Sequence, residues 1–235
     1  MTKRCSAPSR IRGNCAPHVI GVLEDALDWS RGWIETELNS ANDNPLVDPD
    51  ESRLLHGGHF YGGHIALAMD ALKTAVASVA DLLDRQLATL VDTRYNNGLP
   101  ANLSGATGSE APLNHGLKAL QIGASAWTAE ALKQTMPATA FSRSTECHNQ
   151  DKVSMGTIAS RDCLRVLELS EQVAVAMLVA VRQGIALRQR MGHVVPQPLQ
   201  PFFARLEDAM PLLTRDRALE PELRTLLAQV REGQW

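Results

Sequence analysis

Polar side chains with complementary chemistry crowd one stretch of the chain, RSTECHNQDKVSMG, which starts at Arg143. Within it, Glu146 with Asn149 and Gln150 forms a candidate site for an amine and a polarised carbonyl group. The structural alternative is the polar start of a helix, where acidic side chains favour the positive end of the helix dipole. The residue types allow both interpretations.

A second stretch, HGGHFYGGH, starts at His56 and places glycine pairs on both sides of an aromatic pair. Glycine permits positive φ and close backbone approach, so this loop is expected to present Phe60 and Tyr61 into a pocket at the start of a long helix. His56, His59 and His64 are potential metal ligands, but no carboxylate or cysteine completes a recognised spacing. We therefore expect no metal.

A third stretch, NSANDNP at residues 39–45, holds three Asn, one Asp and one Ser. Such side chains hydrogen-bond to nearby backbone and favour turns. A helix cap followed by a loop explains this stretch by itself. The functional alternative is a dense set of amide donors and acceptors at a site.

The composition is that of a folded protein. The 235 residues carry 23 Lys and Arg against 26 Asp and Glu, a net charge of −3, and 44% are hydrophobic. This balance excludes a disordered chain and argues against a nucleic-acid partner, because no basic excess exists to displace counterions. The longest strongly apolar run, Val173 to Val181, is too short to cross a membrane, so we expect no membrane segment.

The cysteines and the N-terminus indicate a reducing compartment. The first residues lack the apolar segment of a secretory signal, and the cysteines form no CxxC pair, so we expect reduced thiols in the cytoplasm. A thiol nucleophile at Cys147 is disfavoured, because the adjacent His148 rarely faces its neighbour and no third orienting group is present. The cysteines are Cys5, Cys15, Cys147 and Cys163.

Apolar residues recur mostly at three- and four-residue steps, which predicts an all-α fold, and no stretch shows the clean alternation of a strand. The proline at position 17 suits a first helical turn. The expected helices are Ala16 to Leu38, Gly63 to Val91, Asn114 to Gln134, Val153 to Arg188, Pro201 to Leu213 and Arg217 to Arg231.

The second half of the longest helix, from Gln172 to Leu187, is apolar on every side. A helix that is apolar all round must be enclosed all round. We therefore expect other chains to help enclose it in an oligomeric bundle. The alternative is the central helix of a monomeric bundle.

These stretches, together with YNNGLPANL and a helix ending in RQGIALR, resemble the aromatic amino acid ammonia-lyases, the superfamily of histidine, phenylalanine and tyrosine ammonia-lyases and related aminomutases. The resemblance covers Cys15 to Arg190 and, more weakly, the C-terminal helices. It implies an all-α, long-helix bundle of the ammonia-lyase type that assembles as a homotetramer. It also divides the chain into a non-family segment 1–14, the C-terminal half of the helical domain at 15–190, and short helices at 191–235.

The family eliminates ammonia from an aromatic amino acid with a methylidene-imidazolone electrophile made from an internal Ala-Ser-Gly. Such an electrophile is needed because the β-hydrogen is weakly acidic and ammonia is a poor leaving group. No Ala-Ser-Gly occurs in this sequence, which resembles the C-terminal half of the family. The resemblance therefore implies a chain that is inactive alone and needs a complementary N-terminal chain. The alternatives are an aminomutase and a non-catalytic scaffold subunit.

The resemblance also implies roles for individual residues. Asn44 matches a position that hydrogen-bonds near the prosthetic group, and Glu146 matches a carboxylate near the substrate amine; both are the expected catalytic residues. Phe60 matches the aromatic beside the substrate, and Asn149 and Gln150 match amides that line the same pocket. Histidine-selective members usually carry Glu at the position of Gln150, which favours phenylalanine or tyrosine as substrate.

One family feature is altered. A Tyr-x-x-Arg, whose arginine holds the substrate carboxylate, normally precedes the first helix of this half. Counted back from Asn44 without a gap, the arginine position falls on Asn14 and the tyrosine position on Ile11. Arg12 is two residues away and is the expected substitute if the backbone shifts locally.

Overall fold

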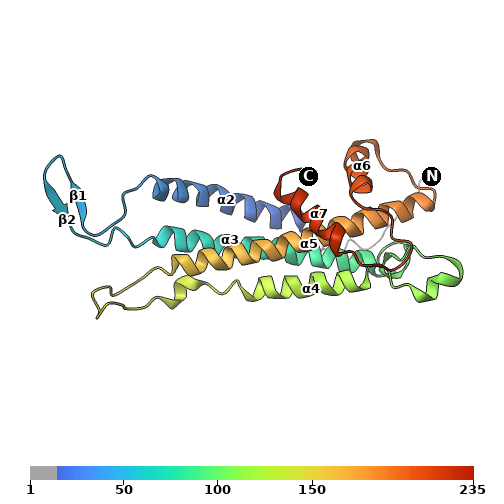
Figure 1. Ribbon diagram of the computed structural model, residues 1–235, viewed down its shortest axis with the longest axis horizontal. Helices are drawn as coiled ribbons and strands as arrows, with labels where there is room; N and C mark the ends of the chain where they lie inside the picture. Colours follow the sequence, from blue (N-terminus) through green and yellow to red (C-terminus); the bar gives the residue numbers. More distant parts are fainter. Residues whose placement is uncertain (1–14) are drawn as a thin grey trace. The chain divides into compact units, whose positions relative to one another are not determined.

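The computed structural model describes residues 15–235, and most of its secondary structure is helical (Figure 1). The all-α prediction is confirmed. Arg12 and the rest of segment 1–14 lie outside the described residues. The helices are α2 (Ala16–Leu38), α3 (Gly63–Val91), α4 (Lys118–Lys133), α5 (Gly156–Arg190), α6 (Gln200–Ala209) and α7 (Glu220–Arg231).

Helices α2 and α3 have the predicted bounds, whereas α4 and α5 begin a few residues later than expected. Gly116 has a φ of +59° and lies in the turn two residues before the start of α4. Met155 has a φ of +62° immediately before α5. A left-handed residue cannot continue a right-handed helix, so each position fixes where the helix starts.

A short hairpin that the sequence analysis missed follows α2. Strand β1 (Leu46–Asp48) pairs antiparallel with β2 (Arg53–Leu55). The turn is held by the Asp48 side chain, whose Oδ1 accepts hydrogen bonds from the backbone N–H groups of Asp50 and Glu51, both at 3.1 Å. Each strand has three residues, too few for an alternating pattern to show.

The described chain forms two compact units, and α2, α3, α4 and α5 contribute residues to both. Unit 1 contains residues 15–19, 79–129 and 169–235, and unit 2 contains Ile20–Ser78 and Glu130–Glu168.

Unit 1 holds the larger core, in which Leu87, Leu117 and Leu226 are fully buried. Its part of α5 is also well covered, because no residue from 171 to 188 is exposed. The chain itself thus supplies the cover that the sequence analysis assigned in part to other chains. The apolar part of α5 is therefore no evidence for an oligomer, and such evidence must come from other surfaces of the chain.

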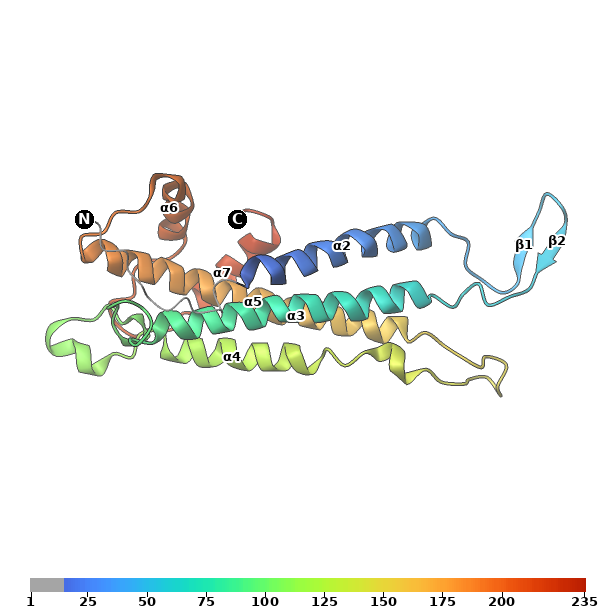
Figure 2. The ribbon, with the colours of Figure 1, turned by 180° about the vertical axis from the view of Figure 1, so that it is seen from behind.

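Unit 2 packs α2 against the beginnings of α3 and α5, which run side by side in both ribbon views (Figures 1 and 2). Ala26, Leu72 and Ala75 form its buried apolar cluster, with Cys163 of α5 packed against it. Most of these side chains are small, so the helices approach closely. Desolvation raises the pKa of the Cys163 thiol.

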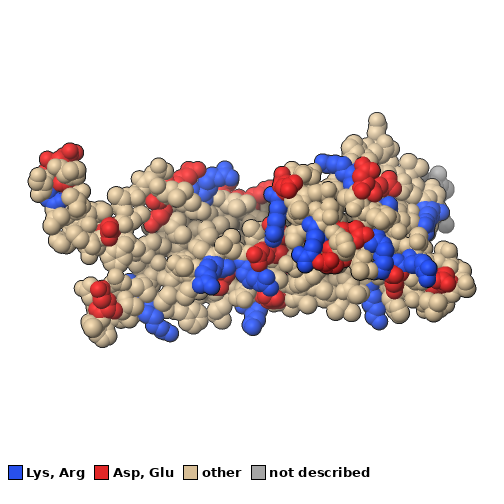
Figure 3. Space-filling model, in the orientation of Figure 1, with Lys and Arg blue, Asp and Glu red and all other residues tan. Residues whose placement is uncertain are grey.

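The surface carries both signs of charge. Figure 3 shows Lys and Arg interspersed with Asp and Glu over the face in view. This mixture matches the small net charge of −3. None of the helices formed by residues 15–235 is long and apolar enough to cross a membrane.

Candidate functional site

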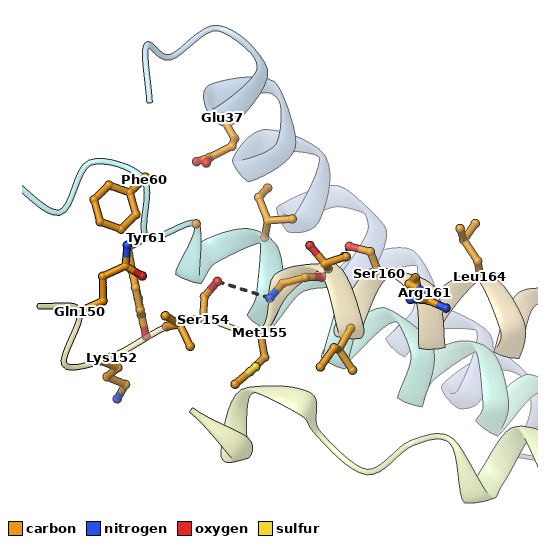
Figure 4. Close-up of a pocket in the computed structure, with 16 residues that line it drawn as sticks. Glu37, Phe60, Tyr61, Gln150, Lys152, Ser154, Met155, Ser160, Arg161 and Leu164 are labelled. Carbon is orange, nitrogen blue, oxygen red and sulfur yellow. Dashed lines mark hydrogen bonds between the residues drawn. The ribbon is translucent and has the colours of Figure 1, made fainter. Parts of the chain in front are cut away.

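A pocket of about 700 Å³ lies in unit 2, where α2 ends and α3 and α5 begin (Figure 4). This volume falls in the range of ~300–1,000 Å³ that is usual for small-molecule sites. The lining residues are Glu37, Phe60, Tyr61, Gly62, Ile65, Gln150, Lys152, Val153, Ser154, Met155, Gly156, Thr157, Ile158, Ser160, Arg161 and Leu164.

The glycine-rich loop supplies the aromatic side of the pocket, as predicted. Phe60 and Tyr61 are each 41% exposed, so their rings are available to a ligand. The loop turns tightly, because the Tyr61 N–H donates to the Gly58 carbonyl at 3.1 Å. Gly62 has a φ of +61°, a conformation that strongly favours glycine, and α3 starts at the next residue.

The stretch before α5 supplies Gln150 to the same pocket. Thr145 and Gln150 form an isolated antiparallel bridge, in which the Thr145 N–H donates to the Gln150 carbonyl at 2.8 Å. Their side chains are also bonded, at 3.2 Å. Figure 4 shows Gln150 beside Phe60 and Tyr61. The structure thus brings together an amide and an aromatic pair that are about 90 positions apart in sequence.

Glu146 and Asn149 occupy the turn between these bridged residues and do not line the pocket. The Asn149 Nδ2 donates to Glu146 Oε2 at 3.0 Å, and both side chains are exposed. Glu146, Cys147 and His148 all have φ values between +52° and +69°. His148 Nδ1 bonds Ser144 Oγ at 2.7 Å rather than the neighbouring thiol.

Asn44 connects two of the loops that the sequence analysis singled out. Its Oδ1 accepts a hydrogen bond from the Gly57 N–H at 3.1 Å. The contact ties the loop after α2 to the glycine-rich loop before α3. Asn44 does not line the pocket itself.

Three charged side chains line the pocket, and the sequence analysis missed all of them. Glu37 comes from the last turn of α2, Lys152 from the stretch before α5, and Arg161 from α5. The only feature of the sequence that pointed to Glu37 was its position two residues before the start of the loop 39–45. Among residues 15–235, no cluster of three or more His, Cys, Asp or Glu side chains could hold a metal ion.

The stretch that carries Gln150 is anchored upstream by a buried group of charges. Lys73 Nζ lies 2.8 Å from Asp70 Oδ1 and 3.3 Å from Asp162 Oδ2, and it donates to the Met136 carbonyl at 2.7 Å. Asp70 in turn accepts the N–H groups at positions 138 and 139, both at 3.0 Å. Burial by itself raises the pKa of Asp70, but these hydrogen bonds outweigh burial and hold the pKa below its ordinary value.

The sequence and the fold match known proteins. The family model described as aromatic amino acid lyase matches residues 10–208. This chain belongs to the aromatic amino acid lyase family. The family resemblance seen in the sequence motifs is therefore confirmed. Phe60 and Gln150, which come from two of these motifs, line the same pocket.

Relatives in the family differ in name and are much longer. The chain is 39% identical over 214 residues to tyrosine ammonia-lyase of Cereibacter sphaeroides, covering 90% of this chain and 40% of that protein. It is 36% identical over 219 residues to histidine ammonia-lyase of Caenorhabditis elegans, covering 93% and 31%. The structure of tyrosine aminomutase from Streptomyces globisporus matches with a TM-score of 0.87 and 28% identity, covering 100% of this chain and 44% of that one. The chain thus spans less than half the length of these relatives.

Proposed function

We propose that this chain is the C-terminal part of an aromatic amino acid ammonia-lyase that eliminates ammonia from phenylalanine, tyrosine or a similar substrate. One observation carries the proposal: a chain of this family places Phe60 and Gln150 in a single pocket of ligand size. The aromatic pair suits the substrate ring, and the amide suits a polar group of the substrate or the electrophile. Gln150 in place of Glu favours phenylalanine or tyrosine over histidine.

The electrophile of the reaction comes from outside these 235 residues, since no Ala-Ser-Gly occurs among them. The pocket fits a methylidene-imidazolone, because half-exposed aromatic rings and an amide can pack against and hydrogen-bond to a planar polar ring. When present, this group supplies an electrophile for the substrate. The residues of this chain bind the substrate, orient it and exclude water.

The expected residue roles remain part of this proposal. Phe60 and Gln150 contact the substrate, and Asn44 keeps its expected catalytic place near the prosthetic group. The hydrogen bond that Asn44 Oδ1 accepts from the Gly57 N–H also holds the glycine-rich loop in place. Glu146 is proposed as a catalytic carboxylate, and Asn149, its hydrogen-bond partner, as a substrate-binding amide. Because neither lines the pocket in the single chain, both depend on the segment that completes the site.

The proposal also covers the role of Arg12, the assembly of the chain and its division into segments. Arg12 is proposed to hold the substrate carboxylate in place of the family arginine. A complementary N-terminal segment and further copies of this chain form a homotetrameric bundle in the cytoplasm. The segments 1–14, 15–190 and 191–235 are the proposed divisions of the chain.

An aminomutase is the second candidate function, favoured by the match to tyrosine aminomutase of Streptomyces globisporus over the whole chain. The two activities share the release of the amine and differ in whether the amine is added back at the β-carbon. The absence of Ala-Ser-Gly from the sequence favours a third candidate, a scaffold without chemistry.

The experiment is to produce this chain alone and together with the N-terminal half of the Cereibacter sphaeroides relative. With phenylalanine or tyrosine, the chain alone should give no unsaturated acid, and the pair should give an unsaturated acid and ammonia in equal amounts. A β-amino acid as the main product identifies the aminomutase. No product from an assembled pair identifies the scaffold, and turnover by the chain alone would overturn the proposed source of the electrophile.

A further inference from the structure

Glu37 is the only carboxylate among the residues that line the pocket. Its Oε1 accepts a hydrogen bond from Asn42 Nδ2 at 3.2 Å. No ion pair with Glu37 is formed by the residues that the structure describes. Other carboxylates of unit 2 do have cationic partners, as Asp70 and Asp162 have in Lys73. The pocket therefore contains a half-buried carboxylate without an ion-pair partner among the described residues. Lys152 and Arg161 line other parts of the same cavity, and neither pairs with Glu37.

The aromatic pair lies on the side toward which this carboxylate points. Figure 4 shows the Glu37 side chain directed from the end of α2 toward Phe60, with Tyr61 and Gln150 beyond. Gly62 lies next to this carboxylate, because a Cβ atom built at this position would be in van der Waals contact with Glu37 Oε1 at 3.8 Å and Ser154 Oγ at 3.9 Å. At this side of the cavity a ligand thus meets an anionic group and two exposed aromatic rings, while the cationic Lys152 and Arg161 line other parts of it.

This combination selects a particular ligand chemistry. A primary ammonium offers three N–H donors, and its hydrogen bond to a carboxylate is charge-assisted and stronger than a neutral one. An aromatic ring on the same ligand would pack on Phe60 or Tyr61. A metal ion is a poorer occupant, because no second acidic side chain lines the pocket.

We propose that Glu37 binds the ammonium group of the aromatic substrate, and so selects aromatic primary amines over aromatic acids that lack the amine. The inference rests on the proposed function for the identity of the substrate. It assigns binding to Glu37, while Glu146 keeps its proposed role in the reaction. Asn42 is a positioning residue, because its amide fixes one carboxylate oxygen and leaves the other for the ligand.

The test measures binding to the full chain by titration calorimetry, with 2-phenylethylamine and 3-phenylpropanoate as probes. The amine should bind more tightly than the acid. Glu37→Gln removes the charge but keeps an acceptor for Asn42, so it should raise the Kd for the amine about tenfold or more and leave the Kd for the acid unchanged or lower. Glu37→Asp should retain part of the amine affinity.

Glu35→Gln is the matched control, because Glu35 is an exposed carboxylate on the same helix and does not line the pocket. It should bind the amine as the unaltered chain does. The inference is overturned if the amine fails to bind, if the acid binds equally well, or if Glu37→Gln leaves the Kd for the amine unchanged. An assembled pair that yields no product while amine binding still depends on Glu37 would reject the proposed function and leave this inference intact.

Discussion

Lys73 Nζ lies 2.8 Å from Asp70 Oδ1, and the two side chains are 0% and 5% exposed. Both residues are on α3, three positions apart, so they face the same side of the helix. Together they bond the Met136 carbonyl and the N–H groups at 138 and 139. A helix that begins at the glycine-rich loop therefore also anchors the segment that leads to Gln150.

Lys73→Met should destabilise the protein by about 3–5 kcal/mol, because it leaves the buried Asp70 carboxylate without its cation. Urea unfolding followed by circular dichroism measures this loss. The same substitution at the exposed Lys133 of α4 is the control and should change stability by about 0.5 kcal/mol or less. A Lys73→Met protein as stable as the control would show that the Asp70–Lys73 pair contributes little to the fold.

The lowered pKa of Asp70 predicts how its contribution depends on pH. A group with a lowered folded-state pKa stabilises the protein fully above its unfolded pKa, which is about 3.9 for aspartate, and the contribution is lost as pH falls through the folded value. The difference in unfolding free energy between the unaltered protein and Asp70→Asn should therefore be constant above about pH 5 and shrink below pH 4. Asp25→Asn, at an exposed position of α2, should show only a small difference throughout. If the difference in unfolding free energy between the unaltered protein and Asp70→Asn grew as the pH fell, it would contradict a lowered pKa for Asp70.

The helices were predictable because their apolar periodicity is local, and α2 and α3 have the expected bounds. The buried Lys73 was not predictable, because its burial depends on Met136 and Asp162, which lie 63 and 89 positions away. The loop that presents Phe60 and Tyr61 was predicted from its glycines. Glu37 was missed because an acidic residue in a last helical turn carries no signal of its own.

Gly105→Ala should destabilise unit 1, because a Cβ atom would overlap the Leu213 carbonyl oxygen and lie 3.1 Å from Gln183 Nε2. Gln183 is fully buried and bonds the carbonyls of Leu103 and Leu213, each at 2.9 Å. The expected loss is about 1–3 kcal/mol. Thermal or urea unfolding measures it.

Gly21→Ala should increase stability, in contrast to Gly105→Ala. Gly21 lies within α2, and nothing lies within 4 Å of an added Cβ atom. Alanine should stabilise this helix by roughly 0.5–1 kcal/mol. The two variants make the same chemical change, so a loss at both positions would show that space around the Cβ atom does not decide the outcome.

Self-association is expected through unit 2, whose helix α2 exposes a large apolar surface. Its exposed apolar side chains are Ile20, Val22, Leu27, Trp29 and Leu38. Val22, which is 62% exposed, is the site for a test. Val22→Glu should weaken association, because a charge costs free energy in an apolar interface. Light scattering over a range of concentrations measures the mass. Val194→Glu, at a position 85% exposed, is the control and should leave the mass unchanged. A monomer at every concentration would contradict the proposed assembly.

Glu146→Gln tests the proposed catalytic carboxylate in an assembly that includes the complementary N-terminal segment. The glutamine keeps an acceptor for Asn149 Nδ2, which donates to Glu146 Oε2 at 3.0 Å, but removes the negative charge. If the charge acts in the reaction, kcat should fall by about tenfold or more, in line with the ~10²–10⁴-fold contribution of a general acid or base. Glu24→Gln, on the exposed face of α2, should keep the original rate.

The Kd of the isolated chain for 2-phenylethylamine should also stay unchanged in Glu146→Gln, because Glu146 does not line the pocket. An unchanged kcat would remove Glu146 from the reaction, whereas a loss of amine binding would show that Glu146 acts in the pocket that Glu37 lines.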